Sequence, residues 1–306
     1  MNGIPEQESC FPVLDPRFLG CDASFHEASV VLFGAPYDGT ASFRPGSRFG
    51  PAAMRQDSAG LETYSPYLDR ELPAGQVHDL GDLELAPGDR NMVLERIRGT
   101  TARIVAAGKT PVMLGGEHLV SLPSVAACLE RWPDLCVLHL DAHADLRQDY
   151  LGERLSHATV MRRVWDLVGD SRIFQMGIRS GTKDEFDFAR SGHTCLKPFD
   201  LESLPEVLAL LGTRPIYLSL DLDVLDPSAF PGTGTPEPGG VDVKSLMRLI
   251  HSLPQKQIIG ADLVELAPHY DISGCSTAVA LKILRELLIG LLSPASGTCA
   301  IIKSGL

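Results

Sequence analysis

Two short stretches of this chain place acidic and imidazole side chains two residues apart at the end of an apolar run. In CVLHLDAHADL these are Asp141, His143 and Asp145, and in IYLSLDLDVLDP they are Asp221 and Asp223. Burying an unpaired carboxylate costs several kcal/mol. Because both runs have the composition of buried strands, we expect cations to lie between these acidic side chains.

A third apolar run ends in LGGEH, which adds the imidazole of His118 to the set. Four aspartates balance the charge of two divalent cations if the histidines are neutral. Carboxylate-rich sites with some imidazole suit Mn²⁺ or Mg²⁺, whereas Zn²⁺ favours thiolate and imidazole. Two such ions about 3.5–4 Å apart lower the pKa of a shared water, so the predicted chemistry is hydrolysis. The predicted metal ligands are His118, Asp141, His143, Asp145, Asp221 and Asp223.

A DAHAD segment alone is equally consistent with a loop whose aspartates cap the following helix. Two acid-tipped runs together with a glycine-flanked His118 favour the metal site. His139 is expected to be an ordinary imidazole because it lies inside an apolar run, and His26, His78, His193, His251 and His269 because they lack acidic partners at ligand spacing. Asp226 is expected to form a turn before Pro227.

Apolar runs of strand length alternate with amphipathic segments of helix length along the chain. The predicted strands are Ser29–Ala35, Thr110–Gly115, Cys136–Ala142, Arg172–Ile178, Ile216–Val224 and Ile258–Leu266. The predicted helices lie near Pro51–Ala59, Asn91–Ala107, Ser121–Arg131, Thr159–Leu167, Lys183–Ser191, Leu201–Leu211, Val243–Ser252 and Ser276–Leu292. This alternation predicts an α/β fold, a parallel sheet covered by helices on both faces. With no linker-like segment, residues 1–28 are expected to form an N-terminal arm and residues 29–306 a single domain.

The predicted ligands fall where such a sheet binds its ligands, outside the carboxyl ends of the strands. His118, the DAHAD segment, the pair Asp221 and Asp223, and Glu265 each follow a different predicted strand. Four strands therefore deliver polar groups to one rim of the sheet.

Composition limits the possible partners. The formal net charge of −12 opposes nucleic-acid binding, which needs a basic surface. No apolar stretch is long enough for a membrane span, and the N-terminus lacks the layout of a secretory signal. The seven cysteines show no CxxC spacing, which argues against a disulfide framework or a zinc ribbon. We therefore expect a cytoplasmic protein.

The sequence resembles the ureohydrolase family, which includes arginase and agmatinase. The resemblance is carried by LGGEH, LDAHADL and SLDLDVLDPSAFPGTGTPEPGG, and also by FRPGSRFGPAAMR, SHATVMRR and GADLVELAPHYD. It extends over nearly the whole chain from about Val31 onward. It implies a three-layer α/β/α domain with a mostly parallel central sheet, and a dinuclear manganese centre held by the six residues named above, with Asp141 and Asp221 as the bridging pair.

The resemblance also implies catalytic roles. His157 matches the proton-shuttling histidine of the family, Glu265 matches the acid that holds the guanidinium group, and Asp145 counts as catalytic as well as a ligand. A capping role shared with Ser156 is the alternative for His157. Glu117 stands where family members often carry Asp, and Ala158 where many carry Gly.

The loop LRQDYLGERLS bears on the choice of guanidino substrate. Asp149 and Glu153 would repel an α-carboxylate and attract an amine, which favours agmatine over arginine. The FRPGSRFGP and PGTGTPEPGG stretches also resemble the agmatinase branch. Guanidinobutyrate, aminopropylagmatine and guanidine are the alternatives, since Arg147 could receive a carboxylate if it pointed into the cleft. The expected reaction is the hydrolysis of agmatine, a small cationic guanidino compound, to putrescine and urea, a step of polyamine biosynthesis.

Other classes of function remain open at this point. A metal-binding regulator without catalysis would bind manganese and release no urea, and amide or formimino hydrolysis could use the same metal pair. The family commonly forms trimers and hexamers, so a homo-oligomer is expected. The apolar helix from Ser276 is a candidate interface, although core packing explains it equally well.

Overall fold

The computed structural model of the chain describes residues 17–86 and 88–292, and its centre is one parallel sheet of eight strands. These strands are β1 (Val30–Ala35), β4 (Val77–Asp82), β5 (Thr110–Gly115), β6 (Cys136–Leu140), β7 (Ile173–Ile178), β8 (Cys195–Pro198), β9 (Ile216–Asp221) and β10 (Ile258–Val264). They lie in the order β4-β1-β5-β10-β9-β6-β7-β8, and every neighbouring pair is parallel. A separate antiparallel pair is formed by β2 (Tyr64–Ser65) and β3 (Arg70–Glu71).

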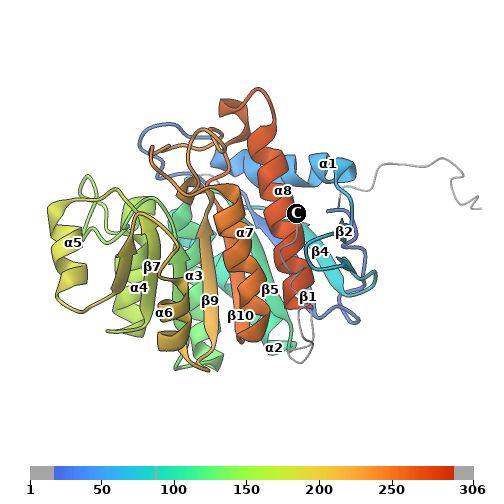
Figure 1. Cartoon of the computed structure of the whole chain (residues 1–306), viewed down its shortest axis with the longest axis horizontal. Helices are drawn as coiled ribbons and strands as arrows, with labels where there is room; N and C mark the ends of the chain where they lie inside the picture. The colour runs from blue at the N-terminus through green and yellow to red at the C-terminus, as the bar shows by residue number, and fades with distance from the viewer. Residues whose placement is uncertain (1–16, 87, 293–306) are drawn as a thin grey trace, which may run out of the picture.

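Helices cover both faces of the sheet (Figure 1). The helices are α1 (Gly50–Asp57), α2 (Arg90–Ala106), α3 (Ser121–Arg131), α4 (Val160–Val168), α5 (Lys183–Arg190), α6 (Leu204–Leu211), α7 (Val243–Ser252) and α8 (Cys275–Leu291). Helices α1, α6, α7 and α8 contribute to one apolar core, and α2 to α5 pack on the opposite side. The predicted three-layer α/β/α fold with a parallel central sheet is confirmed.

Alternation of side chains along each strand divides the core into these two halves. In β6, Leu138 belongs to the core beneath α7 and α8, whereas Val137 belongs to the core beneath α3 and α4. Successive strand residues point to opposite faces, and both of these side chains are fully buried. A strand that is covered on both faces must be apolar nearly throughout, which is why the central strands could be predicted from the sequence.

The strand predictions failed at the two edges of the sheet. Strands β4 and β8 were not predicted, because VHDLGD mixes buried and exposed positions and CLKP is short and half-buried. The predicted strand Ile216–Val224 is also too long. It ends at Asp221, and the chain continues into a 3-10 turn, η5 (Leu222–Val224).

The chain before β1 contacts the edge strand β4. The backbone N–H of Phe18 donates to the carboxylate of Asp79 over 2.8 Å, and Ala23 N–H donates to the carbonyl of Val77. Residues 17–28 of the predicted N-terminal arm thus contact the sheet, while residues 1–16 lie outside the described part of the chain.

Helix α8, the predicted candidate for an interface, is mostly buried within the chain itself, against α1 and α7. Core packing therefore accounts for its apolar character. Within the described residues, no helix combines the length and apolar character that crossing a membrane requires.

Candidate metal centre

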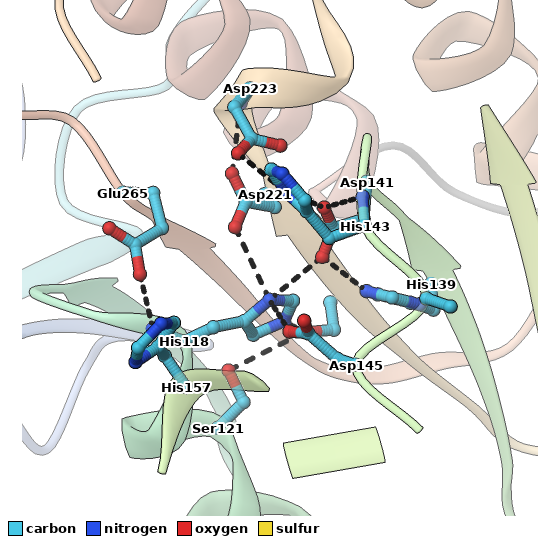
Figure 2. Close-up of polar contacts among 12 residues, drawn as sticks. His118, Ser121, His139, Asp141, His143, Asp145, His157, Asp221, Asp223 and Glu265 are labelled. Atoms are coloured by element: carbon cyan, nitrogen blue, oxygen red, sulfur yellow. Dashed lines mark hydrogen bonds and ion pairs between the residues drawn. The ribbon is translucent and has the colours of Figure 1, made fainter. Parts of the chain in front are cut away.

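The candidate site lies at the carboxyl ends of four neighbouring strands in the middle of the sheet. The chain delivers His118 after β5, Glu265 after β10, Asp221 at the end of β9 and Asp141 after β6. Figure 2 shows these side chains converging with Asp145, Asp223 and His143. The structure therefore brings together all six predicted metal ligands.

The imidazole of His118 is at the centre of one half of this cluster. Its Nδ1 atom lies 3.0 Å from Asp141 Oδ2 and 3.3 Å from carboxylate oxygens of Asp145 and Asp221. All four residues are buried. Yet His118 Nδ1 has no hydrogen-bond partner of acceptable geometry.

The other ring nitrogen explains this orphaned atom. His118 Nε2 lies 2.9 Å from the hydroxyl of Ser219, which itself donates to Asp262 Oδ1 over 2.9 Å. Because the serine hydrogen is directed to Asp262, His118 donates through Nε2–H, and in the neutral ring Nδ1 then carries the lone pair. A lone pair aimed at three carboxylates fits a shared cation, and such an outer hydrogen bond is how proteins orient a histidine ligand.

A second half of the cluster forms around His143. Its Nδ1 atom is 3.0 Å from Asp223 Oδ2 and 3.5 Å from Asp141 Oδ1. Asp141 therefore presents one oxygen to each half, as a bridging ligand would. The side chains of Asp141, His143 and Asp223 offer donor atoms close enough together to hold one ion.

Electrostatics indicate that the cluster needs added positive charge. Burial, followed by repulsion from Asp223, raises the pKa of Asp221 well above its usual range. Burial and the charge of Asp141 raise the pKa of Asp145 to about 7. Although burial opposes ionisation of Asp141, the surrounding imidazoles of His118, His139 and His143 hold its pKa well below normal. Divalent cations would remove this conflict, so the donor set fits a pair of them.

His139, which the sequence predicts to be an ordinary core imidazole, is also a residue of the site. It is buried as expected, but its Nε2 lies 2.8 Å from Asp141 Oδ2. The side-chain amide of Gln175 donates to His139 Nδ1 over 3.0 Å, and the amide oxygen accepts from Thr194. His139 is thus a neutral donor that orients Asp141. The spacing of His139 and Asp141, two apart in the predicted strand Cys136–Ala142 and so expected on one face, was the signal that could have revealed it.

Two of the predicted site residues have left-handed backbone conformations. Asp145 has φ of 54° and Glu265 has φ of 66°, values that are uncommon for residues other than glycine. The Glu265 carboxylate accepts the backbone N–H of His118 over 2.8 Å, and its own N–H donates to Gly116. Burial, followed by the charge of Glu117, raises the pKa of Glu265 to about 8. A cationic ligand would favour its ionised form.

A cavity of about 210 Å³ lies over these groups, and its lining includes His118, Asp145, Glu265 and His157. Arg147 also lines it, with Nε 3.4 Å from Glu185 and the guanidinium 4.8 Å from the ring centre of Tyr150.

The structure does not support the expectation that Asp149 and Glu153 attract a substrate amine in this cavity. Neither residue is among those that line it. Asp149 is exposed to solvent, and Glu153 forms an ion pair with Arg90 over 2.8 Å. The sequence shows the charges of this loop but not the direction in which its backbone presents them.

His157 begins a 3-10 turn, η4 (His157–Thr159), that leads into α4. The capping role is filled by Ser156 and Thr159, whose hydroxyl accepts the Ser156 N–H over 3.0 Å. The imidazole is therefore left for the cavity. Burial and the neighbouring His143 lower the pKa of His157 to about 4.

Asp226 forms a turn as predicted, and it also fixes the loop that follows. One carboxylate oxygen accepts from the N–H and hydroxyl of Ser228, and the other accepts from Gly239 N–H and Gly240 N–H. These hydrogen bonds, those of Ser228 above all, lower the pKa of Asp226 to about 2. The loop closes one side of the site, where Thr235 lines the cavity.

Comparison with known proteins gives consistent matches over the described domain. The model of the arginase family matches residues 28–290. An agmatinase from Bacillus anthracis is 49% identical over 276 residues, which cover 89% of this chain and 95% of that protein. A structure titled as a putative agmatinase from Clostridium difficile superposes with a TM-score of 0.85 at 47% identity, covering 88% of this chain and 98% of the other. The agmatine ureohydrolase of Thermoplasma volcanium gives a TM-score of 0.85 at 33% identity, covering 92% and 95%.

Proposed function

This chain belongs to the arginase family of hydrolases, and we propose that it cleaves the guanidinium group of agmatine to give putrescine and urea. The observation that carries the proposal is the 49% identity to a bacterial agmatinase over nearly the full length of both chains. The donor cluster beneath a small cavity supports it independently, because a hydrolase of this kind needs a site for paired cations.

We propose that the cations are manganese, held by His118, Asp141, His143, Asp145, Asp221 and Asp223. The set contains four carboxylates and two imidazoles and no thiolate, which suits Mn²⁺ or Mg²⁺ more than Zn²⁺. When bound, the ions supply a water of lowered pKa and stabilise negative charge that develops during attack.

Glu265 is the proposed anchor for the guanidinium group. Its carboxylate is held by the backbone N–H of His118 over 2.8 Å, and its side chain lines the cavity. A carboxylate and a planar guanidinium form paired charge-assisted hydrogen bonds, which fix the orientation of the substrate. Orientation matters here because a guanidinium is a poor electrophile with delocalised charge.

His157 is the proposed group that moves the proton to the departing amine. Since its pKa is lowered to about 4, the imidazole is neutral at pH 7 and can accept a proton from water. It can then pass that proton to the amine nitrogen as the carbon–nitrogen bond breaks. The products are urea and the free diamine.

The decisive experiment measures urea released by the manganese-loaded protein from agmatine, arginine, 4-guanidinobutyrate and guanidine in parallel. We expect a strong preference for agmatine. Replacing Glu265 with Gln should raise KM and lower kcat for agmatine, while Glu153→Gln, a matched change outside the cavity, should leave both close to wild type. Metal-loaded protein that releases no urea from any of the four would refute the proposal.

A guanidino acid such as 4-guanidinobutyrate is the second candidate, because Arg147 lines the cavity. Its charge is already compensated by Glu185 and its guanidinium stacks on Tyr150, so agmatine remains the better candidate. An Arg147→Gln variant distinguishes the two. It should weaken turnover of 4-guanidinobutyrate if Arg147 binds a carboxylate, and leave agmatine turnover unchanged or improved.

We also propose a cytoplasmic setting and a trimeric or hexameric assembly. The described cysteines are free thiols, as is usual in a reducing compartment. The proposed assembly rests on the trimers and hexamers that are common in the family. Light scattering of the purified protein would measure the oligomeric state directly.

A further inference from the structure

We propose that Thr40 and Glu117 are positioning residues that together fix the tautomer and the orientation of His157. The inference rests on the proposed function, because it takes His157 as the group that moves the proton. Its physical basis is a chain of three side chains from segments that are far apart in the sequence.

The first link joins Glu117 to Thr40. The Glu117 side chain is completely buried, and its two oxygens accept two hydrogen bonds from the same residue. The Thr40 backbone N–H donates to Oε2 over 2.8 Å, and the Thr40 hydroxyl donates to Oε1 over 2.7 Å. This paired contact fixes the direction of the only hydroxyl hydrogen that Thr40 has.

The second link joins Thr40 to His157. The backbone N–H of His157 donates to Thr40 Oγ1 over 3.1 Å, and the ring Nδ1 atom lies 3.3 Å from the same oxygen. Since the Thr40 hydrogen is already directed to Glu117, the oxygen can only accept here. His157 Nδ1 must therefore carry the hydrogen, which leaves the lone pair on Nε2.

This tautomer is the useful one for the proposed role. His157 Nε2 lies 3.4 Å from the hydroxyl of Ser42, and both residues line the cavity. The basic nitrogen is thus presented on the cavity side, while the protonated nitrogen is held from behind. A proton can then be taken up and released at Nε2 without rotation of the ring.

The backbone brings these segments together at Gly116. A Cβ atom at this position would lie 1.9 Å from the carbonyl oxygen of Tyr37, so only glycine allows the loop before Thr40 to approach so closely. The Glu117 N–H then donates to that same carbonyl over 2.7 Å. Glu117 reaches Thr40 with both oxygens, whereas the aspartate common in the family is one methylene shorter.

The test compares Thr40→Val, Thr40→Ser and His157→Ala with the double variant His157→Ala/Thr40→Val, all manganese-loaded and assayed with agmatine. Thr40→Val should lower kcat about tenfold or more, with KM within about twofold, since general acid–base catalysis contributes about 10²–10⁴-fold. Thr40→Ser, which keeps the hydroxyl, should restore most of this kcat. In the His157→Ala background, Thr40→Val should have no further effect, because residues that act through one group are not additive.

A second measurement is independent of turnover. The ¹⁵N shifts of the His157 ring in protein loaded with diamagnetic Mg²⁺ should report hydrogen on Nδ1 in the wild type and a mixture of tautomers in Thr40→Val. An Nε2–H tautomer in the wild type, or an equal loss of kcat from Thr40→Val in both backgrounds, would overturn the inference. If the wild type released no urea from agmatine, the proposed function would fail, while the ring spectrum would still decide the positioning role.

Discussion

Replacing Ser219 with Ala should weaken metal binding although Ser219 is not itself a predicted ligand. Its hydroxyl accepts from His118 Nε2 over 2.9 Å and donates to Asp262 over 2.9 Å. Without it, the buried Nε2–H loses its acceptor and nothing fixes the tautomer that aims Nδ1 at the carboxylates. Asp262 still accepts a hydrogen bond from the Tyr217 hydroxyl over 2.7 Å. The substitution should therefore affect the orientation of His118 and leave Asp262 paired.

The expected loss of metal affinity follows from the kind of hydrogen bond that the substitution removes. Loss of an outer hydrogen bond to a metal-binding histidine typically costs about 10–100-fold in metal affinity. That corresponds to about 1.4–2.8 kcal/mol, since each tenfold change is worth about 1.4 kcal/mol. Calorimetric titration of metal-free protein with Mn²⁺ measures this directly, with wild type and variant compared at one pH.

Ser58→Ala is the matched control. Ser58 is also buried, and its hydroxyl also accepts one hydrogen bond, from Leu19 N–H, and donates another, to the carbonyl of Arg55, but it lies outside the site. It should lower the free energy of unfolding without changing the affinity for Mn²⁺. Equal affinities in wild type and Ser219→Ala would refute the assignment of His118 Nδ1 as a ligand atom.

Three further predictions concern stability. Gly116→Ala should lower the free energy of unfolding by about 1–3 kcal/mol, the usual cost of overpacking, because the new Cβ meets the Tyr37 carbonyl; an unchanged urea midpoint would contradict this. Asp226→Asn should lower the free energy of unfolding by about 1 kcal/mol at pH 7, a figure that allows for the partial exposure of Asp226. Thermal unfolding of variant and wild type measures this difference. Because the folded pKa of Asp226 is lowered to about 2, this contribution is fully present above its unfolded pKa near 3.9 and is lost as pH falls through about 2. The difference in stability between variant and wild type should therefore narrow below about pH 3.9 and close below about pH 2. Removal of bound metal with a chelator should lower the melting temperature, and Mn²⁺ at about 100 times its Kd should restore about 2.7 kcal/mol, whereas no response to Mn²⁺ would argue against a metal site.

The central part of the fold could be predicted because a strand that is buried on both faces must be a nearly continuous apolar run. The six predicted strands include all four that carry the site, and each is a nearly continuous apolar run. The edge strand β4 was not predicted because Leu80 is 45% exposed and the strand contains three polar or charged residues. Partial exposure removes the very signal on which strand prediction depends.

The metal donors could be predicted for a related reason. Acidic side chains at the end of a buried strand are rare without a partner, so their spacing is informative. The residues that orient the histidines of the site carry no such signal. Thr40, Gln175 and Ser219 are ordinary polar side chains, and Thr40 meets Glu117 across 77 positions of sequence. Only the fold shows that they touch the site.

The order of the strands is what turns scattered donors into one site. Strands β5 and β6 are separated in the sheet by β10 and β9, so their ends lie roughly 14 Å apart at about 4.8 Å per strand. His118 Nδ1 and Asp141 Oδ2 are nevertheless only 3.0 Å apart. The chain closes this distance after β5, where Gly116 lets the backbone pass against Tyr37 and turn into η3 (His118–Val120), toward β9. Gly116 therefore helps to position the predicted ligand His118 that follows it.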